Sequence, residues 1–241
     1  MPGILNRVYH NRTMARLFHT TIHCLQKELA GCESILDLGC GPDSPLRYVD
    51  ARRKVGIDAF EPYVESSKRL GIHDECYRAD ILECDFAPKS FDAAVLIGVL
   101  EHLDREEGER MLDRLELVAS KKILISCPNG FLEQHDHDDN PFQLHRSGWT
   151  VPDFKARGYK VRGMSGLRGL RKKNDIETST LTETSTDVYS TIRFRPRPVW
   201  FAVSAATQIF THYTPTIAFE LMCVKLPSSS EARVTEFRGS A

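Results

Sequence analysis

The chain has 241 residues, of which 41% are apolar and 27% charged, the balance of an ordinary globular protein. Its 32 basic and 33 acidic side chains give a formal net charge of −1, so no overall positive field favours nucleic acid as a partner. The seven cysteines are odd in number and contain no CxxC pair, which favours free thiols in a reducing compartment, and we expect a cytoplasmic protein. The amino terminus is too polar for a signal peptide, and the most apolar late stretch, residues 199–210, is shorter than the roughly 20 residues that span a bilayer.

The first 33 residues carry apolar side chains at helical spacing from Met14 to Leu29, and Gly31 is the expected stop. The pattern predicts one amphipathic helix that caps the domain. His19 and His23 lie one turn apart on this helix, without a third ligand nearby in the sequence. We therefore expect solvated or capping histidines there and no metal.

The stretch that organises the chain is an apolar run over residues 35–39 that ends in Gly-x-Gly at Gly39 and Gly41. It predicts a buried parallel strand followed by a tight turn. A second short strand over residues 54–58 ends in Asp58, 21 residues after Asp37. A carboxylate at the tip of that strand is well placed to accept hydrogen bonds from ribose hydroxyls, so the pattern indicates a nucleoside-containing ligand.

Further strands and helices alternate up to residue 127. In chain order the sequence predicts a short connecting helix at 43–52, a helix at 61–70, strands at 76–79 and 93–97, a helix at 105–119 and a strand at 122–127. Such alternation is typical of a parallel sheet whose ligands bind at the carboxyl ends of the strands.

The pattern changes after residue 130. The remaining segments are a polar loop at 131–149, a short helix at 151–157, a strand at 159–164, an apolar helix at 198–210 and a strand at 216–225 antiparallel to the one before it. We expect an α/β fold with a doubly wound, mostly parallel, seven-stranded Rossmann-like sheet, its last strand antiparallel, and helices on both faces. One domain would span 1–226, with a helical cap at 1–33, an insertion or lid at 166–198 and a polar tail at 227–241.

Five motifs stand in one order, namely ILDLGCGP, VGIDAFEP, RADILE, FDAAVLIGVLEHL and KKILISCPNG. In this order the chain resembles the class I S-adenosylmethionine-dependent methyltransferases over about residues 33–165. The last two motifs look most like the small-molecule "LEH" subgroup. The resemblance implies S-adenosyl-L-methionine as the cofactor.

The resemblance also implies roles for individual residues. Asp37, Gly39 and Gly41, with Cys40 between the glycines, would shape the methionine end of the pocket. Asp58 would bind the ribose, Phe60 would lie near the adenine, Asp80 would accept from the adenine amino group and Ile81 would pack on the ring. Ile97, Gly98 and Val99 would form the floor beneath the methionine and the sulfonium.

Methyl transfer needs an aligned nucleophile and, for a hydroxyl, a base that removes its proton. We expect His145 to be this base, with His102 as the second candidate. The neighbouring His135 and His137 are expected to belong to an exposed polar loop.

The expected activity is transfer of a methyl group to an oxygen, less favourably a nitrogen or carbon, of a small molecule, a sugar or glycan, or a lipid-linked acceptor. One alternative is a non-catalytic partner subunit on the same fold. Another is a metal-assisted quinone or phenol O-methyltransferase, in which Glu101 and His102, or His145 with the loop histidines, would bind a divalent ion; a metal site is not the expectation here. A nucleic-acid methyltransferase is disfavoured because no (N/D)PP(Y/F) motif follows the fourth strand.

Two basic segments, Arg168 to Lys173 and Arg193 to Arg197, precede the last apolar helix. We expect both to be solvated and the helix to pack on the sheet. The alternatives left open are a peripheral contact with anionic lipid headgroups and a homodimer.

Overall fold

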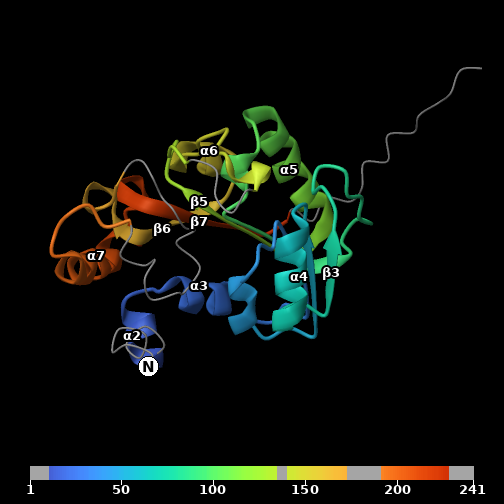
Figure 1. Ribbon diagram of the computed structural model, residues 1–241, viewed down its shortest axis with the longest axis horizontal. Helices are drawn as coiled ribbons and strands as arrows, with labels where there is room; N and C mark the ends of the chain where they lie inside the picture. Colours follow the sequence, from blue (N-terminus) through green and yellow to red (C-terminus); the bar gives the residue numbers. More distant parts are fainter. Residues whose placement is uncertain (1–10, 135–139, 173–190, 228–241) are drawn as a thin grey trace, which may run out of the picture.

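Seven strands form one mixed sheet in the order β3-β2-β1-β4-β5-β7-β6, in which β7 is antiparallel to both neighbours (Figure 1). The structure is a computed structural model that describes residues 11–134, 140–172 and 191–227. The strands are β1 (Ser34–Leu38), β2 (Arg53–Asp58), β3 (Glu75–Arg78), β4 (Phe91–Ile97), β5 (Ala119–Pro128), β6 (Lys160–Leu167) and β7 (Ala218–Lys225). The expected doubly wound sheet with an antiparallel last strand is confirmed.

Helices cover both faces of this sheet. They are α2 (Arg12–Leu17), α3 (Thr21–Glu28), α4 (Glu61–Leu70), α5 (Arg105–Val118), α6 (Val151–Ala156) and α7 (Arg197–Thr211). Successive side chains of a strand point to opposite faces, so Leu36 packs in the cluster with α5 and α6, while Ile35 packs in the cluster with α3. Because both faces are covered, the central strands are mostly apolar. None of the helices in the described part is long and apolar enough to cross a membrane.

The helix expected at residues 43–52 is not formed. The segment holds a single 3-10 turn, η1 (Pro45–Tyr48), and Ser44 caps it by accepting from the Leu46 N–H at 3.2 Å. The hydroxyl of Ser44 also donates to the Asp37 carboxylate at 2.6 Å, which holds the segment against the end of β1. The prediction of a helix was wrong because this local bonding and the prolines favour a turn.

The prediction of a single amino-terminal helix is also wrong, because the helix is interrupted between α2 and α3. His19 has a φ of 47°, and the Thr20 hydroxyl then starts α3 by accepting from the His23 N–H. The His19 ring stacks on His212, at the end of α7, with ring centroids 4.0 Å apart. His19 is therefore a packing residue between the amino-terminal helices and α7, and not a solvated one.

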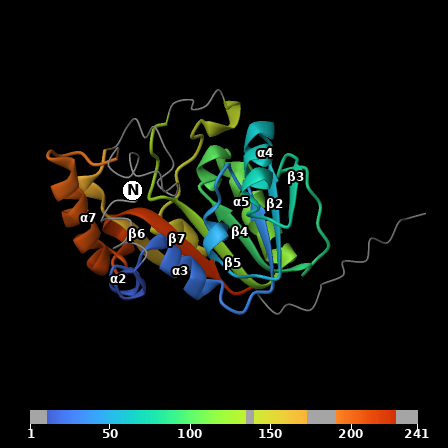
Figure 2. The ribbon, with the colours of Figure 1, turned by 60° about the horizontal axis from the view of Figure 1, so that its bottom comes forward.

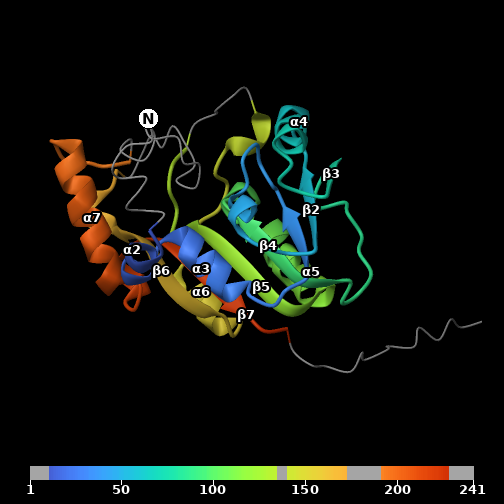
Figure 3. The same ribbon diagram turned by 90° about the horizontal axis from the view of Figure 1, so that it is seen from below.

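The last long helix, α7, lies beside β6 at one end of the sheet, with α4 beside β3 at the opposite end (Figures 2 and 3). It buries its polar side, whereas Val203 and Phe210 are exposed. Gln208 donates to the Gly163 carbonyl at 2.9 Å and accepts from the Gly166 N–H at 2.7 Å. Because β6 is an edge strand, these side-chain bonds satisfy backbone groups that no further strand pairs with. The helix packs on the sheet as expected, but through polar contacts.

One residue of the basic segments is not solvated. Arg171 is buried, and its Nε donates to the Ser165 carbonyl at 3.1 Å. β6 itself continues to Leu167, past the start of the expected insertion at 166–198. Residues 173–190 and 228–241 lie outside the described residues, so the lid, the tail and the domain limits stay predictions.

Replacing Gln208 by Leu should lower the free energy of unfolding by about 2 kcal/mol, because the Gly163 carbonyl and the Gly166 N–H lose a buried partner. Urea unfolding followed by circular dichroism measures the change. The matched control is Val203→Ala on the exposed side of the same helix, for which we expect a change within about 0.5 kcal/mol. Equal midpoints for Gln208→Leu and the unmodified chain would contradict this account of the edge strand.

Candidate functional site

A cavity of about 400 Å³ opens at the carboxyl ends of the central strands. The turn after β1 and the tips of β2 and β4 line one part of it. The loop over residues 140–146 and the side chain of Glu220 from β7 line the other. This is the edge at which ligands of parallel α/β sheets bind.

The turn after β1 crosses the end of β2. The N–H groups of Gly39 and Cys40 both donate to the Ile57 carbonyl, at 2.8 and 2.9 Å. Gly39 has a φ of 71°, and a Cβ there would stand 2.4 Å from a methyl of Val99. Glycine is therefore required at this position, both for the backbone conformation and for the close approach of Val99, which lines the cavity together with Ile97 and Gly98.

Asp58 lies at the centre of the cavity wall. Its two carboxylate oxygens accept from the Gly41 and Phe60 N–H groups, each at 2.9 Å. Burial raises the pKa of this carboxyl, while the two N–H groups oppose the rise. A carboxylate offers about four lone-pair sites, so Asp58 can accept two further hydrogen bonds, as a ribose diol requires.

Asp80 and Ile81 also line the cavity, beyond the end of β3. The Asp80 carboxylate accepts from the Leu82 N–H at 2.8 Å, which fixes the turn that brings the three residues to the wall. The arrangement can hold a flat, amine-bearing ring between an acceptor and apolar side chains.

Two residues named from the sequence do not reach the cavity wall. Asp37 is buried below the turn, where it accepts from Ser44 Oγ at 2.6 Å and from His73 Nε2 at 3.0 Å. Phe60 packs edge-on against Tyr63, with ring centroids 5.0 Å apart, and of these two rings it is Tyr63 that lines the wall. Because Tyr63 follows Phe60 by three residues at the start of α4, only the helix's orientation decides which ring faces the cavity.

The other end of the cavity brings His102 and His145 together, with ring centroids 4.8 Å apart. Nδ1 of His145 bonds the Leu132 carbonyl at 2.6 Å, so this nitrogen donates and Nε2 keeps its lone pair. The His102 ring has the Leu144 carbonyl at 3.3 Å from Nδ1. Burial lowers the pKa of His145, and burial followed by the charge of His145 lowers the pKa of His102 to about 4.

Glu101 lies beside the two histidines. It is 5% exposed, and its Oε2 has no hydrogen-bond partner within the described part of the chain. Burial raises its pKa to about 8, and the neighbouring Glu220 adds to the rise. Ligand atoms of Glu101, His102 and His145 all lie within 4.8 Å of one another, so these three could hold a divalent ion. His135 and His137, the loop histidines considered from the sequence, lie outside the described residues.

Sequence reasoning missed Glu220 as a wall residue. Its carboxylate accepts from the Ser165 hydroxyl at 2.6 Å and faces the cavity from β7. An acid inside an otherwise apolar strand was the available signal. Leu82, Leu132, Gln134 and Asn140 were missed as well, and their loops carry no comparable pattern.

The Glu101→Gln variant should be more stable than the unmodified chain, by an amount that grows from about pH 4.5 to pH 8. The folded pKa of Glu101 lies above the unfolded value, so the unfolded carboxyl releases its proton first and stability falls as pH rises through this window. Glutamine keeps the neutral form at every pH. Thermal unfolding at a series of pH values with EDTA present measures the difference, and Glu83→Gln at an exposed position in the turn after β3 is the control. A difference that is flat with pH would contradict the burial of a neutral carboxyl at this site.

Comparison with known proteins gives a domain match and a fold match. Residues 36–122 match the family model described as a methyltransferase domain. No curated protein matches the sequence. A solved complex between the Haloferax volcanii Trm112 methyltransferase activator and a putative methyltransferase contains a chain that is 15% identical, with a TM-score of 0.52 over 94% of this chain and 96% of that one.

Two further structures align with lower scores. The methyltransferase domain of bacterial CtHen1-CN is 19% identical over 90% of this chain and 100% of that chain, with a TM-score of 0.48. Magnesium protoporphyrin IX methyltransferase from Synechocystis PCC 6803, solved with bound SAM, is 15% identical over 93% and 89%, with a TM-score of 0.47. The matched segment and the sheet order show a methyltransferase domain over residues 36–122 within a Rossmann-like fold. They do not separate the "LEH" subgroup from the others.

Proposed function

We propose that this chain, which carries a methyltransferase domain, transfers a methyl group from S-adenosylmethionine to a hydroxyl of a small molecule, a sugar or glycan, or a lipid-linked acceptor. The observation that carries the proposal is the position of His145. His145 lines the same cavity as Asp58 and Asp80, and its Nε2 keeps a lone pair because Nδ1 carries the proton that bonds Leu132. We call the part of the cavity lined by Asp58 and Asp80 its adenosine end, and the part lined by His145 its basic end.

The residues at the adenosine end suit the cofactor. Gly39 and Gly41 add no side chains on either side of Cys40 in the turn, and Asp58 keeps two lone-pair sites for a ribose. A carboxylate at this position also discourages a 2′-phosphate. The third glycine of a dinucleotide-binding turn is absent, since Pro42 and Asp43 follow Gly41, so the turn suits a methionine moiety and not a pyrophosphate.

The bound cofactor supplies an electrophilic methyl group on a sulfonium. His145 is uncharged at neutral pH because burial lowers its pKa, so Nε2 can take a proton from an acceptor hydroxyl as the oxygen attacks. Glu101 is protonated below about pH 8 and can donate a hydrogen bond to the same oxygen or a neighbouring one. A base is required for a hydroxyl and not for a neutral amine, which is why an oxygen acceptor is favoured.

A metal-assisted reaction is the second candidate. It rests on the cluster of Glu101, His102 and His145 and on the unpartnered Oε2 of Glu101. A divalent ion held there would bind a phenol or diol oxygen and lower its pKa. In that case EDTA abolishes turnover and Mn²⁺ or Mg²⁺ restores it, whereas the metal-free reaction with His145 as base is insensitive to EDTA.

Cofactor binding is tested by calorimetry with S-adenosylhomocysteine. We expect micromolar binding by the unmodified chain and a loss of at least about tenfold in Asp58→Ala, because the ribose hydroxyls lose their acceptor. Asp50→Ala, at an exposed position before β2, should bind normally. An absence of binding at high micromolar concentration would contradict the proposal.

Catalysis is tested with a panel of hydroxyl acceptors and labelled S-adenosylmethionine. His145→Ala should lower kcat by about 100-fold or more while the dissociation constant of S-adenosylhomocysteine stays the same. His23→Ala on α3, remote from the cavity lining, is the control. Full activity of His145→Ala together with inactive His102→Ala would move the role of base to His102. A chain that binds S-adenosylhomocysteine but methylates no acceptor would instead favour the partner-subunit alternative.

A further inference from the structure

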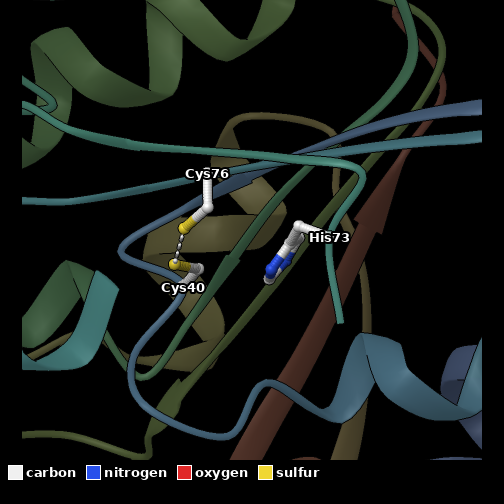
Figure 4. A group of neighbouring side chains, drawn as sticks. All are labelled: Cys40, His73 and Cys76. Carbon is white, nitrogen blue, oxygen red and sulfur yellow. Dashed lines mark hydrogen bonds between the residues drawn. The ribbon is translucent and has the colours of Figure 1, made fainter. Parts of the chain in front are cut away.

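Two cysteines face each other beside the adenosine end of the cavity. The Sγ atoms of Cys40 and Cys76 lie 3.8 Å apart and point toward one another, with the His73 ring to one side (Figure 4). Cys40 belongs to the turn after β1 and lines the cavity, while Cys76 belongs to the edge strand β3. They are 36 residues apart in the sequence.

The fold brings these thiols together across β2. The N–H of Cys40 donates to the Ile57 carbonyl, which carries the turn over the end of β2 toward β3. The residue of β2 that pairs with Cys76 is Gly56, so no β2 side chain separates the two sulfurs from that position. The pair is thus a product of the strand order β1-β2-β3 and of the turn that lies over it.

The two thiols differ in acidity. A hydrogen bond from the Cys40 thiol, with smaller effects from Ser67 and the charge of His73, lowers the pKa of Cys76 to about 6. The same hydrogen bond and burial raise the pKa of Cys40. Cys76 is also the more exposed of the two thiols, because Cys40 is buried, so Cys76 is the sulfur that an oxidant in solvent reaches first. A half-buried thiolate next to a second thiol is the arrangement that oxidants attack first.

A metal ion is not the better occupant of this cluster, although ligand atoms of Cys40, His73 and Cys76 lie close enough together. Both ring nitrogens of His73 are engaged, Nδ1 with Ser67 Oγ at 2.8 Å and Nε2 with the Asp37 carboxylate at 3.0 Å. Only the two sulfurs remain for an ion, and a structural zinc site needs four ligands.

We propose that Cys40 and Cys76 form a reversible disulfide that makes cofactor binding dependent on redox state. With hydrogen peroxide as the oxidant, Cys76 in its thiolate form attacks the peroxide and becomes a sulfenic acid, and the hydroxide that leaves takes up the proton that the Cys76 thiol had released and becomes water. Cys40 then attacks that sulfur, the S–S bond forms and a second water leaves. Two thiols are oxidised and one peroxide is reduced to two waters, and a dithiol reductant reverses the change.

The disulfide would act on the cavity through Cys40. The two sulfurs must close from 3.8 Å to about 2 Å, so the turn between Gly39 and Gly41 is drawn toward β3. The N–H of Gly41 donates to the Asp58 carboxylate, and the shift alters this bond and the wall it supports. This second half of the proposal rests on the proposed function, whereas the formation of the disulfide does not.

The disulfide itself is tested on the full chain. Treatment with hydrogen peroxide, alkylation of remaining thiols and digestion should yield a Cys40–Cys76 linked peptide that is lost after dithiothreitol. Cys76→Ser should yield none, and Cys84→Ser, which removes another half-buried thiol, should yield it normally. Peroxide-treated chain without the linked peptide, or a stoichiometric zinc ion that Cys76→Ser removes, would overturn the proposal.

The effect on the cofactor is tested by calorimetry with S-adenosylhomocysteine on the reduced and the oxidised chain. We expect at least tenfold weaker binding after oxidation, recovery with dithiothreitol and no redox effect in Cys76→Ser. If the reduced chain binds S-adenosylhomocysteine tenfold more tightly, saturating S-adenosylhomocysteine stabilises the reduced form. The reduction potential of the disulfide should then rise by about 30 mV. Equal affinities of the two forms overturn the regulatory half. A reduced chain that binds no S-adenosylhomocysteine overturns the proposed function, while the linked peptide still decides the disulfide.

Discussion

The buried carboxylate of Asp37 is the contact on which the cofactor end of the molecule depends. It lies in β1, 1% exposed, and its Oδ2 accepts from both Ser44 and His73. A buried carboxylate without partners costs several kcal/mol, so the turn after β1 and the segment before β3 must stay in the positions that supply these donors. The sequence resemblance places Asp37 at the pocket, and the structure shows that it acts from below, by holding the turn that forms the wall.

The same hydrogen-bond network determines how residues pack around β2 and β3. A Cβ at residue 56 would stand only 2.9 Å from the His73 ring. Packing against this ring therefore requires glycine at position 56. Ser67 holds the other side of this ring and ties α4 to the network. The glycine of β2, the carboxylate of β1 and the histidine before β3 form one unit, and Cys40 and Cys76 approach each other beside it.

The alternation of apolar strands and helices was enough to predict the sheet, because a doubly covered parallel sheet needs continuous apolar strands. Features that depend on tertiary partners were not predictable. The break at His19 reflects stacking on His212, which is 193 residues away, and the buried polar side of α7 reflects the unpaired edge of β6. At the site, Asp58 and Asp80 followed from their places at strand ends, whereas Glu220 reaches the cavity only because β7 lies between β5 and β6.

Burial controls the charge of the ionisable groups at the end of the cavity that Glu101 and His145 form. Burial raises the pKa of Glu101 and lowers that of His145, so both groups are neutral at the same pH. One is then a hydrogen-bond donor and the other an acceptor, which is the combination needed to hold and deprotonate a hydroxyl. If both were charged, they would form an ion pair and neither would be free for the acceptor. Burial of Glu101 and His145 is therefore what would suit this end of the cavity to the proposed general base chemistry.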